Sequence, residues 1–245
     1  MDSLQQALSQ LINFYDSPMG LALYRAEKRM LETYITNIFG YHLLQIGGPE
    51  DLSWLKSSPI RNHHRFSDCI NNVDVASACY GKLDMLPFVS EGIDLIFLPH
   101  TLNLLQDTTA VLTEVKRCLA TEGRLIIINF VPYRMFYWQC SFQSALPNIY
   151  WHSYNDIHRV LDQLGFNIKL LKSFFHKPYI NNDKILQKLY ILDAIGRTFC
   201  SWLGNVQMIV AQKNIFGLTP VTKNLKNKPK LILNGNIAPT LRKRS

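Results

Sequence analysis

Two adjacent glycines at the end of an apolar segment are the first residues in this sequence with a recognisable chemical use. They lie in HLLQIGGPED (residues 42–51), where Gly47 and Gly48 follow five residues typical of a buried strand. A glycine can adopt a positive φ and lets the backbone approach a bound molecule closely. In a doubly wound sheet, ligands bind beyond the carboxyl ends of the strands. The pattern therefore predicts a cofactor turn, and an ordinary tight strand-to-helix turn stays open as the alternative.

A second segment carries a more specific pattern. It reads GKLDMLPF, then EGIDLIFLPHTLNLL, and a predicted helix leads from there into EVKRCLATEGRLIIINF. Together with the glycine turn, residues 42–131 resemble the type 11 branch of the class I S-adenosylmethionine-dependent methyltransferases. The residues that match the family pattern are Leu86, Pro87, Phe88, Asp94, His100, Leu102, Glu114, Leu119, Gly123 and Leu125. The N-terminal SPMGLALYRAEKRML and the basic KNKPK further resemble a little-characterised proteobacterial subgroup of that family.

The resemblance implies where S-adenosylmethionine binds. Its methionine part would lie over the glycines, its adenine near Asp84, and its sulfonium between Leu98 and His100. The residues assigned to the cofactor in this way are Gln45, Gly47, Gly48, Asp84, Met85, Leu86 and Leu98.

His100 is the candidate catalytic residue. Because the methyl carbon of this cofactor is already activated, the protein has to align the acceptor, exclude water and in some reactions remove a proton. The imidazole of His100 is the side chain we expect to accept that proton. A ring that only hydrogen-bonds a loop carbonyl is the structural alternative.

Several residues around the glycine turn depart from the family pattern. The acid expected two positions before the first glycine is Gln45, which can accept a hydrogen bond from an ammonium but adds no charge–charge attraction. Pro49 removes a backbone N–H, and Glu50 and Asp51 repel an anionic group although they suit a helix dipole. No acid clearly ends the second predicted strand, where the family has one on the ribose. The nearest candidates are Asp68 and Asp74.

Two functions are therefore open. The first is a methyltransferase that uses S-adenosylmethionine to methylate an unidentified small-molecule acceptor. The second is a catalytically degenerate protein that keeps the methyltransferase fold as a binding or interaction scaffold, because a fold alone does not imply a function.

The elements that must position these residues follow from hydrophobic periodicity. Helices are expected over 3–14, 18–38, 107–120, 154–165 and 184–203, with a short one near 49–56. Strands are expected over 42–46, 60–67, 71–80, 93–100, 124–131, 167–175 and 206–213. Apolar strands separated by helices indicate a parallel sheet covered on both faces. The predicted fold class is α/β, a doubly wound, mostly parallel, Rossmann-like sheet of the class I methyltransferase type.

Capping residues set the expected helix limits. Ser17 and Pro18 begin the second helix, Asp107 caps the third, Gly123 ends it, and Ser153 caps the fourth. The apolar face expected for the second helix consists of Leu23, Ala26, Met30, Tyr34 and Ile38.

Charge divides the chain unevenly. The net charge is +8, from 26 basic and 18 acidic residues, and the eight basic residues from Lys213 onward account for all of it. We expect a helical extension over 1–40, a methyltransferase-like domain over 41–214 and a loosely held basic tail over 215–245. RNA, anionic lipid or an acidic partner could bind such a tail, whose salt dependence would be steep.

The compartment and the absence of a metal are also expectations from composition. The five cysteines stand singly, which argues against a disulfide framework and a structural zinc site. His63 and His64 have no third metal ligand at a useful spacing. The N-terminus lacks a signal-peptide pattern, and no apolar run is long enough for a transmembrane helix. These features predict a cytoplasmic protein without a metal.

Overall fold

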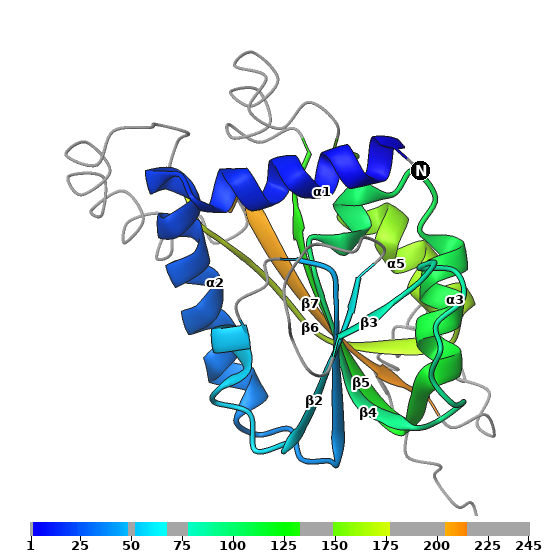
Figure 1. The fold of residues 1–245 in the computed structure, drawn as a ribbon. Helices are drawn as coiled ribbons and strands as arrows, with labels where there is room; N and C mark the ends of the chain where they lie inside the picture. The colour runs from blue at the N-terminus through cyan, green and yellow to red at the C-terminus, as the bar shows by residue number, and fades with distance from the viewer. Residues whose placement is uncertain (1, 49–51, 68–77, 133–148, 177–203, 215–245) are drawn as a thin grey trace, which may run out of the picture. The chain divides into compact units, whose positions relative to one another are not determined.

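The structure, a computed structural model, describes residues 2–48, 52–67, 78–132, 149–176 and 204–214 (Figure 1). Residues 1–215 form one compact unit. Some features expected from the sequence lie outside the described residues. They are Pro49, Glu50, Asp51, Asp68, Asp74, the helix over 184–203 and the tail over 215–245.

Seven strands form one sheet in the order β3-β2-β1-β4-β5-β7-β6 (Figure 1). They are β1 (His42–Ile46), β2 (Asn62–Ser67), β3 (Ala78–Tyr80), β4 (Ile93–Pro99), β5 (Leu119–Phe130), β6 (Phe166–Phe174) and β7 (Val206–Lys213). Neighbouring strands are parallel, except that β7 runs antiparallel to both β5 and β6. The predicted mostly parallel, doubly wound sheet is therefore confirmed.

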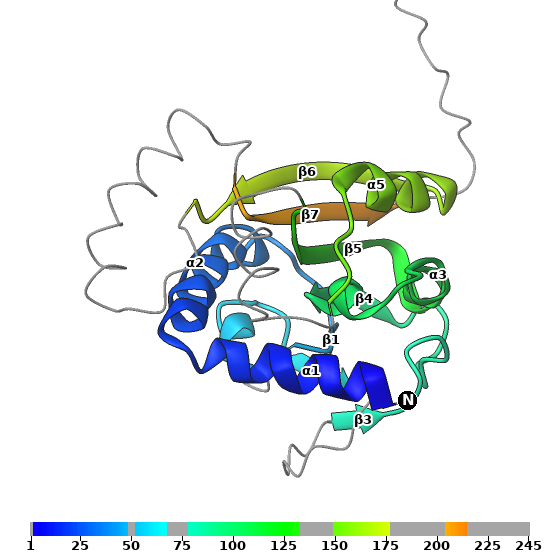
Figure 2. The same ribbon diagram turned by 90° about the horizontal axis from the view of Figure 1, so that it is seen from above.

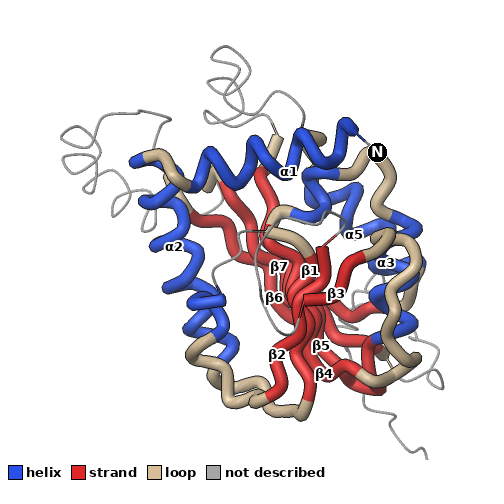
Figure 3. The backbone as a smooth tube through the Cα atoms, viewed as in Figure 1, coloured by secondary structure: helices blue, strands red, loops and turns tan. Residues whose placement is uncertain are grey.

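Helices cover both faces of this sheet (Figures 2 and 3). They are α1 (Asp2–Tyr15), α2 (Pro18–Ile35), α3 (Thr109–Cys118) and α5 (Tyr154–Gln163), with short 3₁₀ turns η1 (Leu52–Leu55) and η2 (Thr101–Leu104). One hydrophobic cluster joins α1, α2 and η1 to the sheet, and a second joins α3 and α5 to its other face. Helix α1 crosses the carboxyl ends of the central strands (Figure 1). No helix in the described part of the chain is long and apolar enough to cross a membrane.

Helix α2 begins as predicted, but its buried face differs from the prediction. The Ser17 hydroxyl accepts a hydrogen bond from the Gly20 N–H at 3.0 Å, and Pro18 is the first helical residue. The row that lies against the core is Met19, Leu23, Glu27, Leu31 and Ile35, whereas Ala26, Met30 and Tyr34 are only partly buried. Ala26, Met30 and Tyr34 of the predicted face each precede a buried residue by one position. Apolar periodicity missed the buried row because one of its members, Glu27, is an acid.

Helix α3 ends earlier than expected. The N-cap position is Thr108, one residue later than predicted, and the Asp107 carboxylate accepts a hydrogen bond from the Thr109 N–H at 2.8 Å. The prediction that Gly123 ends the helix is wrong. Leu119 is fully buried and pairs with Ile93 of β4, so β5 begins directly after Cys118 and contains the glycine.

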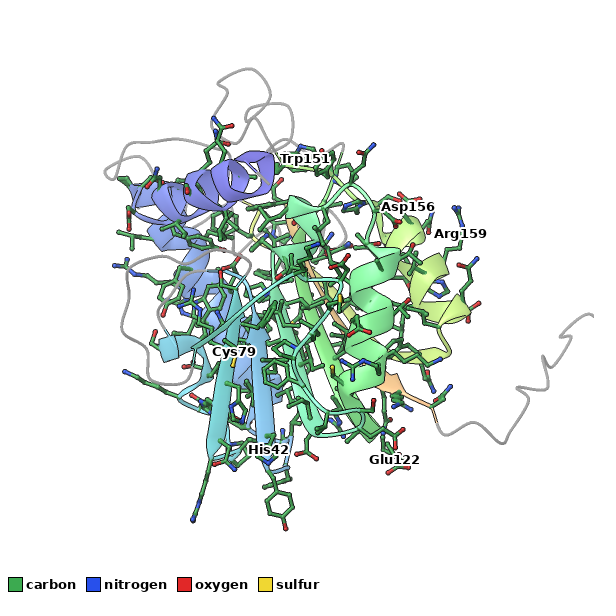
Figure 4. All side chains as sticks on the ribbon, turned by 45° about the vertical axis from the view of Figure 1, so that its right-hand side comes forward. His42, Cys79, Glu122, Trp151, Asp156 and Arg159 are labelled. Atoms are coloured by element: carbon green, nitrogen blue, oxygen red, sulfur yellow. The ribbon has the colours of Figure 1, made fainter. Side chains whose placement is uncertain are left out.

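Helix α5 has the limits that its sequence signals predict. Ser153 and Asp156 form a capping box in which each side chain binds the other's backbone N–H (Asp156 is labelled in Figure 4). Gly165 follows the last turn with a φ of 76°.

Two side chains of α3 hold the loop between β3 and β4. Arg117 donates hydrogen bonds to the carbonyls of Leu86 and Phe88, each at 2.9 Å. The Glu114 carboxylate accepts from Arg117 at 2.9 Å and from the Leu86 N–H at 3.2 Å. The hydrogen bonds from Arg117 lower the pKa of Glu114, although partial burial opposes the shift. This loop carries the residues that the resemblance assigns to the adenine.

Glu114→Gln should therefore destabilise the fold at neutral pH, and the effect should fade in acid. Because the folded-state pKa of Glu114 lies below its usual value, its stabilisation is present above about pH 4.5 and is lost as the pH falls further. A loss of about 1 kcal/mol corresponds to a fall in Tm of about 2–4 °C.

Thermal unfolding followed by circular dichroism between neutral and acid pH measures this. Glu122→Gln, the same charge change at an exposed residue of β5, is the matched control. A loss in Tm that stays constant across the pH range would contradict the role given to Glu114.

Candidate functional site

The candidate site lies where the strand order of the sheet reverses. The chain passes from β1 through β2 to β3 on one side and from β4 to β5 on the other, so the switch point lies between the carboxyl ends of β1 and β4. Doubly wound sheets bind ligands at this place, which we call the crevice. Gly47 and Gly48 follow β1 there, and His100 follows β4. In Figure 4, His42 marks the opposite, amino end of β1, while Trp151 lies toward the end where the site is.

Both glycines of the first turn have a backbone that favours glycine. Their φ angles are 71° at Gly47 and 76° at Gly48. A Cβ at Gly47 would lie 3.0 Å from the Thr101 hydroxyl oxygen, and one at Gly48 would overlap the Pro99 side chain. The turn is therefore packed closely against the residues that follow β4, and this packing alone requires two glycines.

Three buried polar side chains hold this turn. Gln45 donates its amide N–H to the Gly47 carbonyl at 2.9 Å, and Arg65 donates to the Gly48 carbonyl at 3.1 Å. The Thr101 hydroxyl donates to the carbonyl of Ile46. A carboxylate at position 45 could not donate the first of these bonds, which gives a physical reason for the glutamine. The guanidinium also places a buried positive charge behind the turn.

His100 is completely buried and bonded to a carboxylate. Its backbone has a φ of 56°, and its N–H donates to the Ile128 carbonyl at 2.8 Å. Its Nε2 lies 2.7 Å from Oε1 of Glu27, which is 1% exposed. The ring lies against Phe130, with 4.1 Å between centroids. Nδ1 has no hydrogen-bond partner among the described residues. The alternative in which the ring bonds only a loop carbonyl is not what the structure has.

Tyr15, from α1, completes this arrangement. Its hydroxyl donates to Oε2 of Glu27 at 2.9 Å. Burial, together with the charge and hydrogen bond of Glu27, raises the pKa of Tyr15 well above its usual value, so the phenol stays protonated and acts as a donor. We call Tyr15, Glu27 and His100 the buried network.

The sequence analysis missed two members of the buried network. Glu27 lies in a row of residues four apart with Leu23, Leu31 and Ile35, all of them buried. A lone acid within such an apolar row was a signal that could have identified it. Tyr15 offered no comparable signal, because an aromatic residue at the end of an amphipathic helix is common.

Aromatic rings surround the buried network. Trp54 of η1 contacts Tyr15 edge to face, with 6.0 Å between centroids, and Phe97 of β4 in the same way at 5.5 Å. Phe14 of α1 contacts Phe130 at 6.4 Å. The Nε1–H of Trp54 is buried, with no hydrogen-bond partner in the described part of the chain. The surroundings of the buried network are thus apolar.

The remaining predicted cofactor residues lie less close together. Asp84 and Met85 are exposed on the loop after β3, Met85 with 74% of its surface accessible. The side chains of Leu86 and Leu98 are buried in the cluster under α3, so Leu98 can offer a ligand only its backbone. The structure places Gln45, Gly47, Gly48 and His100 at the carboxyl ends of β1 and β4. The Asp84 loop follows β3, the strand at the edge of the sheet.

The described residues contain no candidate metal centre, but they do line a cavity in another part of the sheet. In the described ranges, no group of three or more His, Cys, Asp and Glu could hold a metal ion. A cavity of about 340 Å³ lies at the amino ends of the strands, away from the switch point, and is lined by Asn37, Ile38, Phe39, Asp94, Thr121, Glu122, Gly123, Arg124 and Gln212.

Comparisons with known proteins relate both the sequence and the fold of this chain to methyltransferases. The family model described as a methyltransferase domain, type 11, matches residues 63–127. The uncharacterized protein YafS of Escherichia coli is 29% identical over 226 residues, which cover 88% of this chain and 87% of that protein.

Solved structures share the fold at low sequence identity. A methyltransferase from Thermotoga maritima, titled a possible histamine N-methyltransferase, has a TM-score of 0.60 at 14% identity, over 85% of this chain and 99% of that one. Geranyl diphosphate C-methyltransferase from Streptomyces coelicolor has a TM-score of 0.56 at 12% identity, over 79% and 80% of the two chains. The family model therefore matches the middle of this chain, and the sheet order is that of the class I S-adenosylmethionine-dependent methyltransferase fold.

Proposed function

We propose that this protein binds S-adenosylmethionine at the crevice between β1 and β4 and transfers its methyl group to a small-molecule acceptor. The observation that carries the proposal is the position of the buried network. Nδ1 of His100 has no hydrogen-bond partner among the described residues and belongs to the residue that follows β4, while the glycine turn follows the neighbouring strand.

The residues at the crevice suit the cofactor. The glycine turn allows close approach of the methionine part, and the Arg65 guanidinium behind it attracts the carboxylate. The exposed Asp84 carboxylate is available to the adenosine, on a loop that Glu114 and Arg117 hold in place. When bound, the cofactor supplies a methyl group already activated by a sulfonium.

Gln45 takes a supporting role in this proposal. Its amide N–H is occupied by the Gly47 carbonyl, so it shapes the turn on which the methionine part rests. The negative charge that the family pattern places at this position is supplied nearby by Glu27. Its carboxylate contacts His100 at the adjoining strand end.

A small acceptor fits the aromatic surroundings of the site. The rings of Tyr15 and Phe130 contact that of His100, and Trp54 contacts Tyr15, so the surroundings of the buried network are aromatic. Pockets with mostly aromatic walls and few polar atoms are typical of small-molecule sites. The names of two structural relatives also mention small acceptors, histamine and geranyl diphosphate.

Gly47→Ala should weaken the binding of S-adenosylhomocysteine by at least about ten-fold. A Cβ there would lie 3.0 Å from the Thr101 hydroxyl oxygen and would change the path of the turn. The variant should also lose about 1–2 kcal/mol of stability, because alanine is strained at a φ of 71°. Isothermal titration calorimetry with S-adenosylmethionine and S-adenosylhomocysteine measures the affinities.

Gly165→Ala is the matched control for this experiment. Gly165 has a φ of 76°, so it carries the same backbone strain at the end of α5, remote from the crevice. The proposal predicts similar stability losses in both variants and a loss of affinity in Gly47→Ala alone. Equal affinities in the two variants would contradict it. Absence of binding by the wild type would favour an interaction scaffold.

Asp84→Asn should weaken S-adenosylhomocysteine binding by roughly 10- to 100-fold. The reason is the loss of a hydrogen bond to a charged acceptor, about 1.5–3 kcal/mol. Asp162→Asn, on the exposed face of α5, removes the same charge elsewhere. Titration of the two variants side by side tests the assignment, and identical affinities would place the adenosine away from the Asp84 loop.

A further inference from the structure

The burial of Glu27 requires an explanation beyond packing. Its carboxylate is 1% exposed and lies within the apolar row of α2, where an aliphatic residue would pack without a desolvation cost. Removing a carboxylate from water costs several kcal/mol unless it is paired and hydrogen-bonded. Here both oxygens are occupied, one by Tyr15 and the other by His100. An energetically expensive group held this completely is typical of a functional site.

The proton positions in the network follow from its donors and acceptors. Tyr15 keeps its proton and donates to Oε2, so Glu27 acts there as an acceptor. We assign Glu27 as an acceptor at both oxygens, and the Oε1 contact at 2.7 Å then takes its proton from Nε2 of His100. In a neutral imidazole, Nδ1 then carries the free electron pair. The same atom has no partner in the described residues.

We propose that Glu27 and Tyr15 are positioning residues that hold His100 as a neutral base with its Nδ1 electron pair available to the methyl acceptor. The inference rests on the proposed function and deepens it. It makes the two N-terminal helices part of the reaction centre, because α1 contributes Tyr15 and α2 contributes Glu27. The same logic, in which a carboxylate orients a histidine that acts as the base, operates in hydrolase triads.

The chemistry of such a base limits the class of acceptor. As the acceptor's heteroatom forms its bond to the methyl carbon, the sulfonium–methyl bond breaks and leaves a neutral thioether. The proton of the acceptor passes to Nδ1, and Glu27 stabilises the imidazolium that results. Only an acceptor that loses a proton on methylation needs such a base. Acceptors of this class are hydroxyls, thiols, and primary or secondary amines.

Nuclear magnetic resonance of the full-length protein tests the assignment without any cofactor. The protein is labelled with ¹⁵N-histidine, and His100→Gln identifies the resonances of His100 among the seven histidines. At about pH 8, where an ordinary imidazole is neutral, His100 should carry its proton on Nε2 alone. That proton should resonate far downfield and exchange slowly, because it lies in a short bond to a carboxylate.

Two variants separate the positioning role from packing. Glu27→Gln keeps the shape of the side chain and removes its charge, so the downfield proton should move upfield while the circular dichroism spectrum stays native. Glu32→Gln makes the same change elsewhere on α2, where the carboxylate contacts Ser57, and should leave the resonance unchanged. Tyr15→Phe should shift it less than Glu27→Gln does.

The wild-type spectrum alone can overturn the proposal. A proton on Nδ1, or on both nitrogens at this pH, would leave no base facing the acceptor, whether or not the variants fold. S-adenosylhomocysteine titrated into the same samples reports on the proposed function separately. Binding with the wrong tautomer would defeat only the inference, and the right tautomer without binding would defeat only the function.

The position of the transferred methyl provides the second measurement. The product formed from methyl-labelled S-adenosylmethionine should be an ether, a thioether or an N-methyl amine, each formed with loss of a proton. A labelled sulfonium or quaternary ammonium product needs no base and would contradict the proposal.

Discussion

The burial of one carboxylate organises the functional end of this molecule. Glu27 can remain in an apolar interior only because Tyr15 and His100 occupy both of its oxygens. Those two bonds join α1, α2 and the residue after β4 at a single point. The positive φ of His100 and the contact of its ring with Phe130 then fix the direction of the imidazole. The site is therefore built from the sheet and the N-terminal helices together.

The interactions that hold the turn after β1 differ from those that the family pattern predicts. Its carbonyls are held by donors from Gln45, Arg65 and Thr101, all of them buried. Gln45 in place of an acid removes a negative charge and adds an N–H donor, which stabilises the turn by bonding the Gly47 carbonyl. Among the described residues, the one buried acid is Glu27, from α2. The local sequence thus departs from the pattern, whereas the glycine turn itself is held in place by these buried donors.

Most of the fold could be predicted from the sequence, because strands and helices have distinct apolar periods and strong caps. The residues that matched the family pattern are largely structural. Asp94 accepts hydrogen bonds from the N–H groups of Tyr41 and His42 at 2.7 and 2.9 Å, and Glu114 anchors a loop. They explain why the resemblance predicted the fold well. The predicted end of α3 at Gly123 was wrong, because Leu119 already pairs with β4 and the helix therefore ends before the glycine.

The buried network could not be predicted in the same way. Glu27 and His100 are 73 residues apart, and only the packing of α2 against the sheet brings them together. Apolar periodicity treats an acid as a solvent-facing residue, so Glu27 was assigned to no site. The unpartnered Nδ1 of His100 likewise depends on tertiary structure, since a sequence does not show which nitrogen is occupied.

A crystal structure of the protein with S-adenosylhomocysteine is the most direct test of this account. The account predicts that the methionine part lies against Gly47 and Gly48, and that the thioether sulfur lies on the side of the crevice where His100 Nδ1 is. The cavity at the amino ends of the strands, bordered by Asp94 and Arg124, is a second place in the described part of the chain where a ligand could bind. Ligand density there, with the crevice between β1 and β4 filled by protein side chains, would contradict the account.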